Sequence, residues 1–161
     1  MKDYDDVLVS LRRITRAIDL YSKRLQKDTG LTTSQLLVMQ SIADLENPTP
    51  SAIAKEVVLS QATVTNLIDR LERNQLVVRK RSLKDKRTVN VSLTPRGAKI
   101  IDGAPELLQT EFLRHYRKLQ EWERHWLVAA LQRVATMMDA EDLDASPILE
   151  LGELSTPPGQ S

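Results

Sequence analysis

The chain has 161 residues, of which 41% are hydrophobic and 28% are charged, a balance typical of a globular protein. It contains no cysteine, which excludes disulfides and thiol redox chemistry. No apolar run approaches the roughly 20 residues that span a bilayer, and the acidic start, residues 1–6, does not resemble a signal peptide. We therefore expect a cytoplasmic protein.

The net charge of +1 hides an uneven distribution of charge along the chain. Residues 73–98 contain eight basic residues and one acidic residue, whereas residues 99–161 contain six basic and eleven acidic residues. A concentrated basic segment is what binding to a polyanion requires.

Helical signals fill the first part of the chain. An apolar stripe with spacings of three and four predicts a helix over about residues 4–27, which Gly30 ends. Thr32 and Gln35 form a capping-box pattern that opens a second helix through about Leu45. A Thr49–Pro50 start predicts a short third helix, and Ser60 is expected to cap a fourth. These two helices are predicted over residues 51–57 and 61–73, and the fourth is expected to bury Val64, Leu67, Ile68 and Leu71.

The apolar period then changes from that of a helix to that of a strand. Residues 77–81 and 88–93 read as two strands that flank a charged tip, residues 82–87, with Val89, Val91 and Leu93 facing inward. Thr94–Pro95 opens a fifth helix toward Leu119, which Gly103 and Pro105 should kink or break. A last helix is predicted over residues 121–138. The acidic stretch 141–161 has the composition of a flexible tail.

Two short helices joined by a tight turn and followed by a hairpin make a winged helix-turn-helix, and its second helix fits the major groove of duplex DNA. Glutamine and asparagine can pair with adenine, and basic hairpin residues suit phosphates. Arg87 is predicted to enter a minor groove, and Asp85 to brace the hairpin tip or to hold Arg87. The predicted DNA-binding residues are Ser51, Ser60, Gln61, Thr63, Thr65, Asn66, Arg70, Arg73, Arg79, Arg81, Lys84, Asp85, Lys86 and Arg87.

Several segments resemble the MarR family (multiple antibiotic resistance regulators), over roughly residues 5–140. They are residues 60–72 in the fourth helix, residues 76–79 and 85–87 in the wing, residues 91–97 at the end of the hairpin, and residues 30–32 with Gln35. The sequence departs from the family pattern at Val58 and Gln75, where the family often has glycine. Both departures suggest small backbone adjustments.

The resemblance implies a mainly α fold with about six helices and a β-hairpin wing, assembled as an intertwined homodimer. It implies a winged helix-turn-helix domain over residues 32–94 and a helical dimerisation domain over residues 4–31 and 95–140. It also implies a transcriptional repressor that binds a pseudo-palindromic operator and responds to a small-molecule effector. The predicted dimer interface comprises Val7, Leu8, Leu11, Ile14, Trp122, Trp126, Leu131 and Val134.

Residues 11–20 also resemble members that repress ectoine or other compatible-solute operons, which would make the signal osmotic or ionic. Regulation of drug efflux or of aromatic-compound catabolism is the alternative within the family. A winged helix used as a protein–protein module is the alternative of a different class, but it predicts an apolar recognition surface rather than a basic one.

Other chemistry finds little support in the sequence. There is no Ser/His/Asp grouping and no glycine-rich phosphate loop, so we expect neither an enzyme nor a cofactor. Glu111 with His115, and Glu121 with His125, have the spacing of helical metal ligands, but such pairs are more often surface residues, and we expect no metal. Trp122 and Trp126 suit core or dimer packing better than a ligand cavity.

Overall fold

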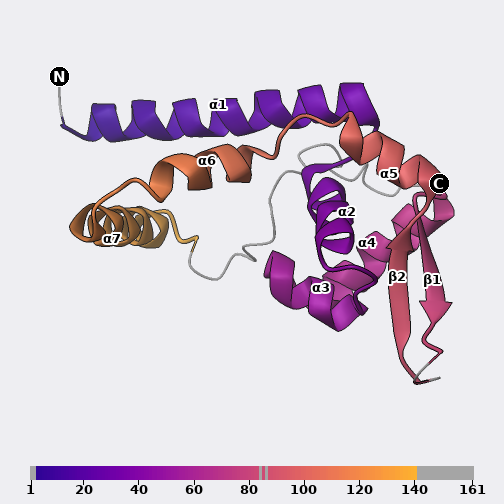
Figure 1. Cartoon of the computed structure of the whole chain (residues 1–161). Coiled ribbons are helices and arrows are strands. Elements are labelled where there is room, and N and C mark those ends of the chain that lie inside the picture. The colour runs from indigo at the N-terminus through magenta and orange to yellow at the C-terminus, as the bar shows by residue number, and fades with distance from the viewer. Residues whose placement is uncertain (1–2, 84, 86, 141–161) are drawn as a thin grey trace, which may run out of the picture. The chain divides into compact units, whose positions relative to one another are not determined.

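The computed structural model describes residues 3–83, 85 and 87–140. The described part of the chain contains seven helices and one two-stranded antiparallel sheet (Figure 1). It divides into a first compact unit, residues 3–105, and a second, residues 106–140. The predicted tail, residues 141–161, lies outside the described residues.

The first unit opens with a long helix, α1 (Asp3–Thr29), whose apolar stripe is exposed or half-buried apart from Leu25, which is buried. Gly30, at φ +73°, ends it in the left-handed conformation that glycine adopts without strain. The predicted capping box is confirmed. Thr32 Oγ1 accepts from the Gln35 backbone, and Gln35 Oε1 accepts from the Thr32 backbone, at the start of α2 (Thr33–Asp44).

Helices α3 (Pro50–Val57) and α4 (Gln61–Arg73) follow, and each starts at the hydroxyl cap that the sequence predicted. Thr49 accepts from the backbone N–H of Ala52, and Ser60 from that of Thr63. The predicted buried face of α4 is confirmed, because Val64, Leu67, Ile68 and Leu71 are all buried. They pack into one core with α2 and α3, since α2, α3 and α4 all contact one another.

The hairpin comprises β1 (Val77–Arg81) and β2 (Val89–Leu93), paired in antiparallel register from Val77–Leu93 to Arg81–Val89. Its base is anchored on the core, since Val77 and Val91 are buried and the Val91 backbone N–H donates to the Pro48 carbonyl at 2.8 Å. The first unit ends with α5 (Pro95–Asp102), capped by Thr94 as predicted.

The second unit contains α6 (Leu108–Tyr116) and α7 (Glu121–Met137), and no residue of either helix is fully buried. The helix predicted from Thr94 toward Leu119 is broken rather than kinked, because α5 ends at Asp102 and α6 begins at Leu108. This break makes seven helices in the described part of the chain, where the sequence predicted about six. None of the helices in the described ranges is both long and apolar enough to cross a membrane.

Candidate nucleic-acid interface

The exposed side of α4 carries the polar residues that the sequence assigned to base recognition. Gln61, Thr65 and Asn66 are exposed in its first two turns, and Arg70 and Arg73 are exposed near its end. Burial of the opposite side fixes the rotation of the helix, so these side chains face outward together. The arrangement offers amide groups and hydroxyls at one end of the helix and guanidinium groups at the other.

Thr63 differs from its neighbours because its hydroxyl is engaged within the helix start. The Oγ atoms of Ser60 and Thr63 lie 2.7 Å apart, and Ser60 also accepts from the Thr63 backbone at 3.1 Å. Both residues were predicted to contact DNA. In the structure they build the N-cap that presents Gln61, Thr65 and Asn66.

The turn between α3 and α4 has an unusual backbone. Val58 lies in the left-handed region at φ +56°, and the backbone N–H of Leu59 bonds back to the Ala54 carbonyl at 3.1 Å. Gln75 repeats this geometry after α4, with φ +59° and a bond from Leu76 N to the Leu71 carbonyl at 2.9 Å. Neither residue is glycine, so both carry the steric cost of the left-handed conformation.

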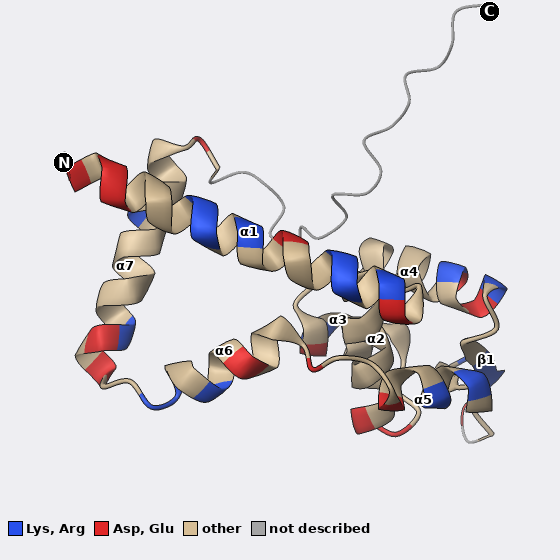
Figure 2. Cartoon of the chain, turned by 90° about the horizontal axis from the view of Figure 1, so that it is seen from above, with Lys and Arg blue, Asp and Glu red and all other residues tan. Residues whose placement is uncertain are grey.

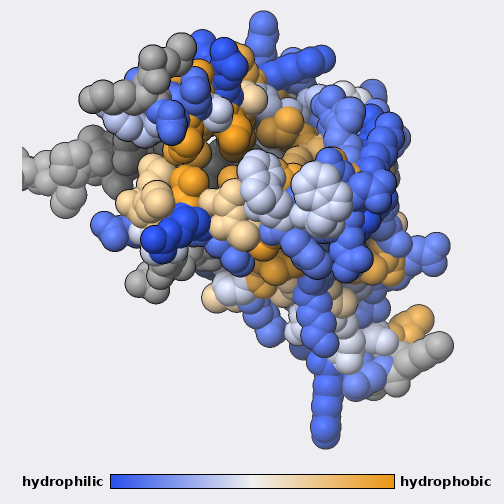
Figure 3. Space-filling view, turned by 90° about the vertical axis from the view of Figure 1, so that its left-hand side faces the viewer, coloured by the Kyte–Doolittle hydropathy of each residue, from blue (hydrophilic) through white to orange (hydrophobic). Residues whose placement is uncertain are grey.

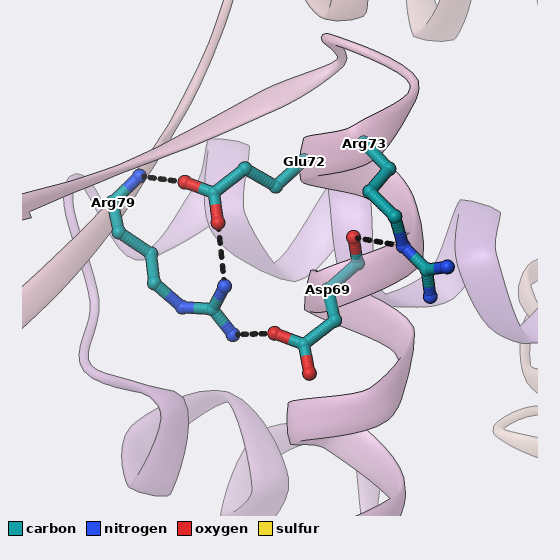
Figure 4. A network of polar contacts seen from close by, with 4 residues as sticks. All are labelled: Asp69, Glu72, Arg73 and Arg79. Atoms are coloured by element: carbon teal, nitrogen blue, oxygen red, sulfur yellow. Dashed lines mark hydrogen bonds and ion pairs between the residues drawn. The ribbon is translucent and has the colours of Figure 1, made fainter.

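Arg79 on β1 joins the wing to α4 (Figure 4). Its guanidinium donates to Asp69 Oδ1 at 2.5 Å and to Glu72 Oε2 at 2.6 Å, and its backbone N–H donates to Glu72 Oε1 at 3.0 Å. Partial burial, the largest single influence, lowers the pKa of Arg79. The hydrogen bonds and charges of Asp69 and Glu72 together outweigh it and raise that pKa above its ordinary value.

From the sequence, Arg79 was predicted to contact a DNA phosphate, and in the structure it also has partners within the protein. Its guanidinium is already shared between two carboxylates, and only 26% of the side chain is exposed. Arg73 completes the network, because its Nε donates to the Asp69 carbonyl at 3.4 Å. Sequence reasoning missed Asp69 and Glu72 as partners. The sequence signal that could have indicated these partners is a pair of acidic residues, three positions apart, directly before the most basic segment of the chain.

The wing tip is braced by Asp85, as the sequence predicted. Its Oδ1 accepts from the Arg87 backbone N–H at 2.9 Å, and its Oδ2 accepts from the Thr88 hydroxyl at 3.1 Å. The carboxylate therefore holds the backbone at Arg87, and the structure gives no ion pair between the two side chains. Two predicted contacts, Lys84 and Lys86, lie outside the described residues.

Basic side chains are concentrated on the wing, where Figure 2 shows β1 in the blue of Lys and Arg. Lys80, Arg81 and Arg87 are exposed there, and Ser51 is exposed on α3. The structure thus brings the exposed side of α4 and the basic wing into one compact unit.

The base of the wing is tied to α5 through Thr94. Its hydroxyl donates to the Gln75 carbonyl at 2.7 Å and accepts from the Gly97 backbone at 3.0 Å, while its own N–H donates to the Leu76 carbonyl at 3.0 Å. Arg96 adds a bond from Nη1 to the Asn74 carbonyl at 3.3 Å. Residues 94–97 thereby fix the segment that leads from α4 into β1.

The candidate metal ligands do not come together. Across residues 3–83, 85 and 87–140, no group of three or more His, Asp or Glu side chains has a geometry that could hold a metal ion. His115 and His125 are exposed on α6 and α7.

Comparison with known proteins identifies the architecture. Residues 31–89 match the sequence profile of the MarR family. The HTH-type transcriptional regulator SarZ of Staphylococcus epidermidis is 33% identical over 110 residues, which cover 68% of this chain and 73% of SarZ. The chain belongs to the MarR family. It is a MarR-type transcriptional regulator, and its relatives are regulators rather than enzymes, in agreement with the sequence analysis.

Solved MarR-type structures share the fold. A complex of S. aureus MepR with DNA has a TM-score of 0.56 at 22% identity, with 80% of this chain and 93% of MepR covered. BpsR of Bordetella bronchiseptica, whose structure addresses regulation of DNA binding by 6-hydroxynicotinic acid, has a TM-score of 0.53 at 25% identity, with 81% and 98% covered.

Val58 and Gln75 adopt a backbone conformation that is easier for glycine. Both stand where the family often has glycine, and both keep a positive φ. From the sequence, small backbone adjustments were expected at these positions. The structure instead holds both residues in the left-handed region, where the strain falls on the residue itself.

Proposed function

We propose that this MarR-type regulator binds duplex DNA with α4 in the major groove and the β1–β2 wing along the phosphate backbone. The observation that carries the proposal is the pairing, within one compact unit, of an exposed polar helix face with a basic hairpin fixed beside it. The helix supplies side chains that can read base edges, and the wing supplies charge that gives affinity. MepR, which shares the fold, has been solved on DNA.

Measuring the affinity of the full chain for duplex DNA across a salt series tests this proposal. Each phosphate that a cation neutralises contributes about −0.9 to the slope of log affinity against log salt. We expect a steep negative slope. A flat response would contradict DNA binding and favour a winged helix that contacts another protein.

We propose that the regulator acts as a homodimer, with residues 32–94 as the DNA-binding domain and residues 4–31 and 95–140 as the dimerisation domain. The support is apolar surface that one chain leaves uncovered, some of it visible as orange in Figure 3. Trp122 and Trp126 are 69% and 66% exposed on α7. Val7, Leu8, Ile14 and Leu131 are exposed as well, while Leu11 and Val134 are half-buried.

Light scattering tests the dimer. The replacement Trp126→Asp together with Leu131→Asp should yield a monomer, because charges are strongly unfavourable in an apolar interface. Gln132→Asp, an exposed neighbour on α7, should leave a dimer. Two-fold symmetry would then predict a pseudo-palindromic operator. A monomeric wild-type protein would contradict the proposal.

We further propose that the protein is a cytoplasmic repressor whose operator affinity changes with a small-molecule or osmotic signal. BpsR shares the fold, and its DNA binding is regulated by 6-hydroxynicotinic acid, which supports a small-molecule effector for this protein. The resemblance of residues 11–20 supports a compatible-solute operon as the regulated gene set. Mapping binding sites across the organism's own genome tests this, since sites beside drug-efflux or aromatic-catabolism genes would contradict it.

A further inference from the structure

Arg79 links the wing to the helix that is proposed to enter the major groove. It reaches from β1 to two successive turns of α4, where Asp69 and Glu72 lie on the same side of the helix (Figure 4). Three hydrogen bonds link the wing strand to the helix, two from the guanidinium and one from the Arg79 backbone. Such a planar two-pronged contact fixes direction as well as distance.

The negative charges of Asp69 and Glu72 are a second reason to consider the role of Arg79. Asp69 and Glu72 are partly exposed on the helix proposed to enter the groove, with 48% and 38% of their side chains accessible. Two unpaired carboxylates at that position would repel phosphates. Arg79 forms an ion pair with both carboxylates and so offsets part of their negative charge.

We propose that Arg79 is a positioning residue, which holds the wing at a fixed angle to α4 and offsets one of the two negative charges of Asp69 and Glu72, and which makes no phosphate contact of its own. The proposal rests on the proposed DNA binding. It separates Arg79 from Arg81, two residues further along the same strand. Arg81 is exposed and, among the residues that the structure describes, forms no ion pair with α4.

A double-mutant cycle on DNA affinity tests this, using Arg79→Met, the pair Asp69→Asn with Glu72→Gln, and all three changes together. We expect Arg79→Met alone to weaken binding about tenfold, because it frees the wing and exposes both carboxylates. In the background that lacks the carboxylates, the same change should cost less than about threefold. Equal losses in both backgrounds would overturn the proposal.

The salt series supplies a second, independent readout. Arg79→Met should leave the slope of log affinity against log salt near the wild-type value, whereas loss of a phosphate contact lowers its magnitude by about one. Arg81→Met is the matched control and should lower the slope by about one, with the same loss in both backgrounds. A lowered slope for Arg79→Met would show that Arg79 contacts a phosphate, and the proposal would fail.

The position of the wing relative to α4 can also be measured in the absence of DNA. The chain has no native cysteine, so spin labels attach only to cysteines that are introduced. Spin labels at Ala62→Cys on α4 and Lys80→Cys on β1, both exposed positions, report the distance between helix and wing. Arg79→Met should broaden the distance distribution, and Arg81→Met should not. If Arg79→Met does not fold, Arg79→Lys takes its place, since lysine keeps the charge but cannot bond both carboxylates as a fork. An unbroadened distribution would overturn the proposed positioning role.

These outcomes are distinguishable from failure of DNA binding itself. A wild-type protein whose affinity is insensitive to salt would contradict the proposed function. A salt-sensitive wild type with equal Arg79→Met losses in both backgrounds would contradict the role of Arg79 alone.

Discussion

Gly97, in the first turn of α5, lies directly against the backbone of Leu76 at the start of the wing. A Cβ built on Gly97 would lie 2.1 Å from the Leu76 carbonyl oxygen, well inside van der Waals contact. That oxygen also accepts from the Thr94 backbone N–H at 3.0 Å. The glycine of the Thr94–Pro95–Arg96–Gly97 run is therefore required by the close approach of two backbone segments, one of which leads from α4 into β1.

Gly97→Ala should destabilise the protein, because the added methyl group meets backbone atoms that cannot rotate away. We expect a loss of about 2–3 kcal/mol in the free energy of unfolding, measured by urea denaturation. Gly103→Ala is the matched control, since its Cβ would lie no closer than 3.8 Å to any neighbouring atom. It should change stability by less than about 0.5 kcal/mol. Equal effects of the two substitutions would contradict the packing argument.

Val58→Gly should stabilise the protein. Val58 is 86% exposed, so its removal loses little buried surface, and its φ of +56° is strained for a β-branched residue. Relief of that strain, offset by the greater freedom of glycine in the unfolded chain, should raise the free energy of unfolding by roughly 0.5–1 kcal/mol.

The control for Val58→Gly is the same replacement in a regular helix. Val128 is exposed on α7, and Val128→Gly should lower stability by roughly 0.5–1 kcal/mol, because glycine is a poorer helix former. Opposite signs at the two positions would establish the backbone as the cause. A destabilising Val58→Gly would mean that the turn is not strained.

Arg87→Ala should weaken DNA binding and reduce its salt dependence, if the wing contacts the phosphate backbone of DNA as proposed. The Arg87 side chain is exposed, while its backbone is held by Asp85. Fluorescence anisotropy across a salt series should show a slope smaller by about one than that of the wild type. Arg133→Ala on α7 removes the same charge outside the proposed interface and should leave the slope unchanged.

Asn66→Ala should weaken binding at one base pair rather than uniformly. An asparagine that reads an adenine contributes about 1–3 kcal/mol of discrimination at its position. The measurement is affinity for a set of operator variants that each carry one changed base pair. The wild type should discriminate at the contacted position and Asn66→Ala should not. A loss of equal size for every variant would assign Asn66 to positioning of the helix.

Much of the fold follows from contacts between residues near one another in the sequence. The caps of α2, α3, α4 and α5 were predictable because a Thr or Ser hydroxyl bonds to a backbone N–H only three residues away. The buried face of α4 was predictable because its apolar residues repeat with the helical period. The bracing role of Asp85 also acts over two or three residues, and the sequence indicated it.

Roles that depend on the approach of separate elements were decided only by the tertiary structure. Charge patterning grouped Arg79 with the other wing cations, yet the side of β1 that faces α4 gives it two carboxylates from residues seven and ten positions away. The same holds for Gly97, which the sequence marked as part of a motif and which only packing against Leu76 explains. The sequence alone determined where most helices and strands begin and end, because local hydrogen bonds and apolar periodicity set those limits. The start of α6 at Leu108 is an exception. Which charged side chains have partners within the protein depends on the tertiary structure, because a guanidinium that bonds internal carboxylates cannot be told from an exposed one until the strand is placed against the helix.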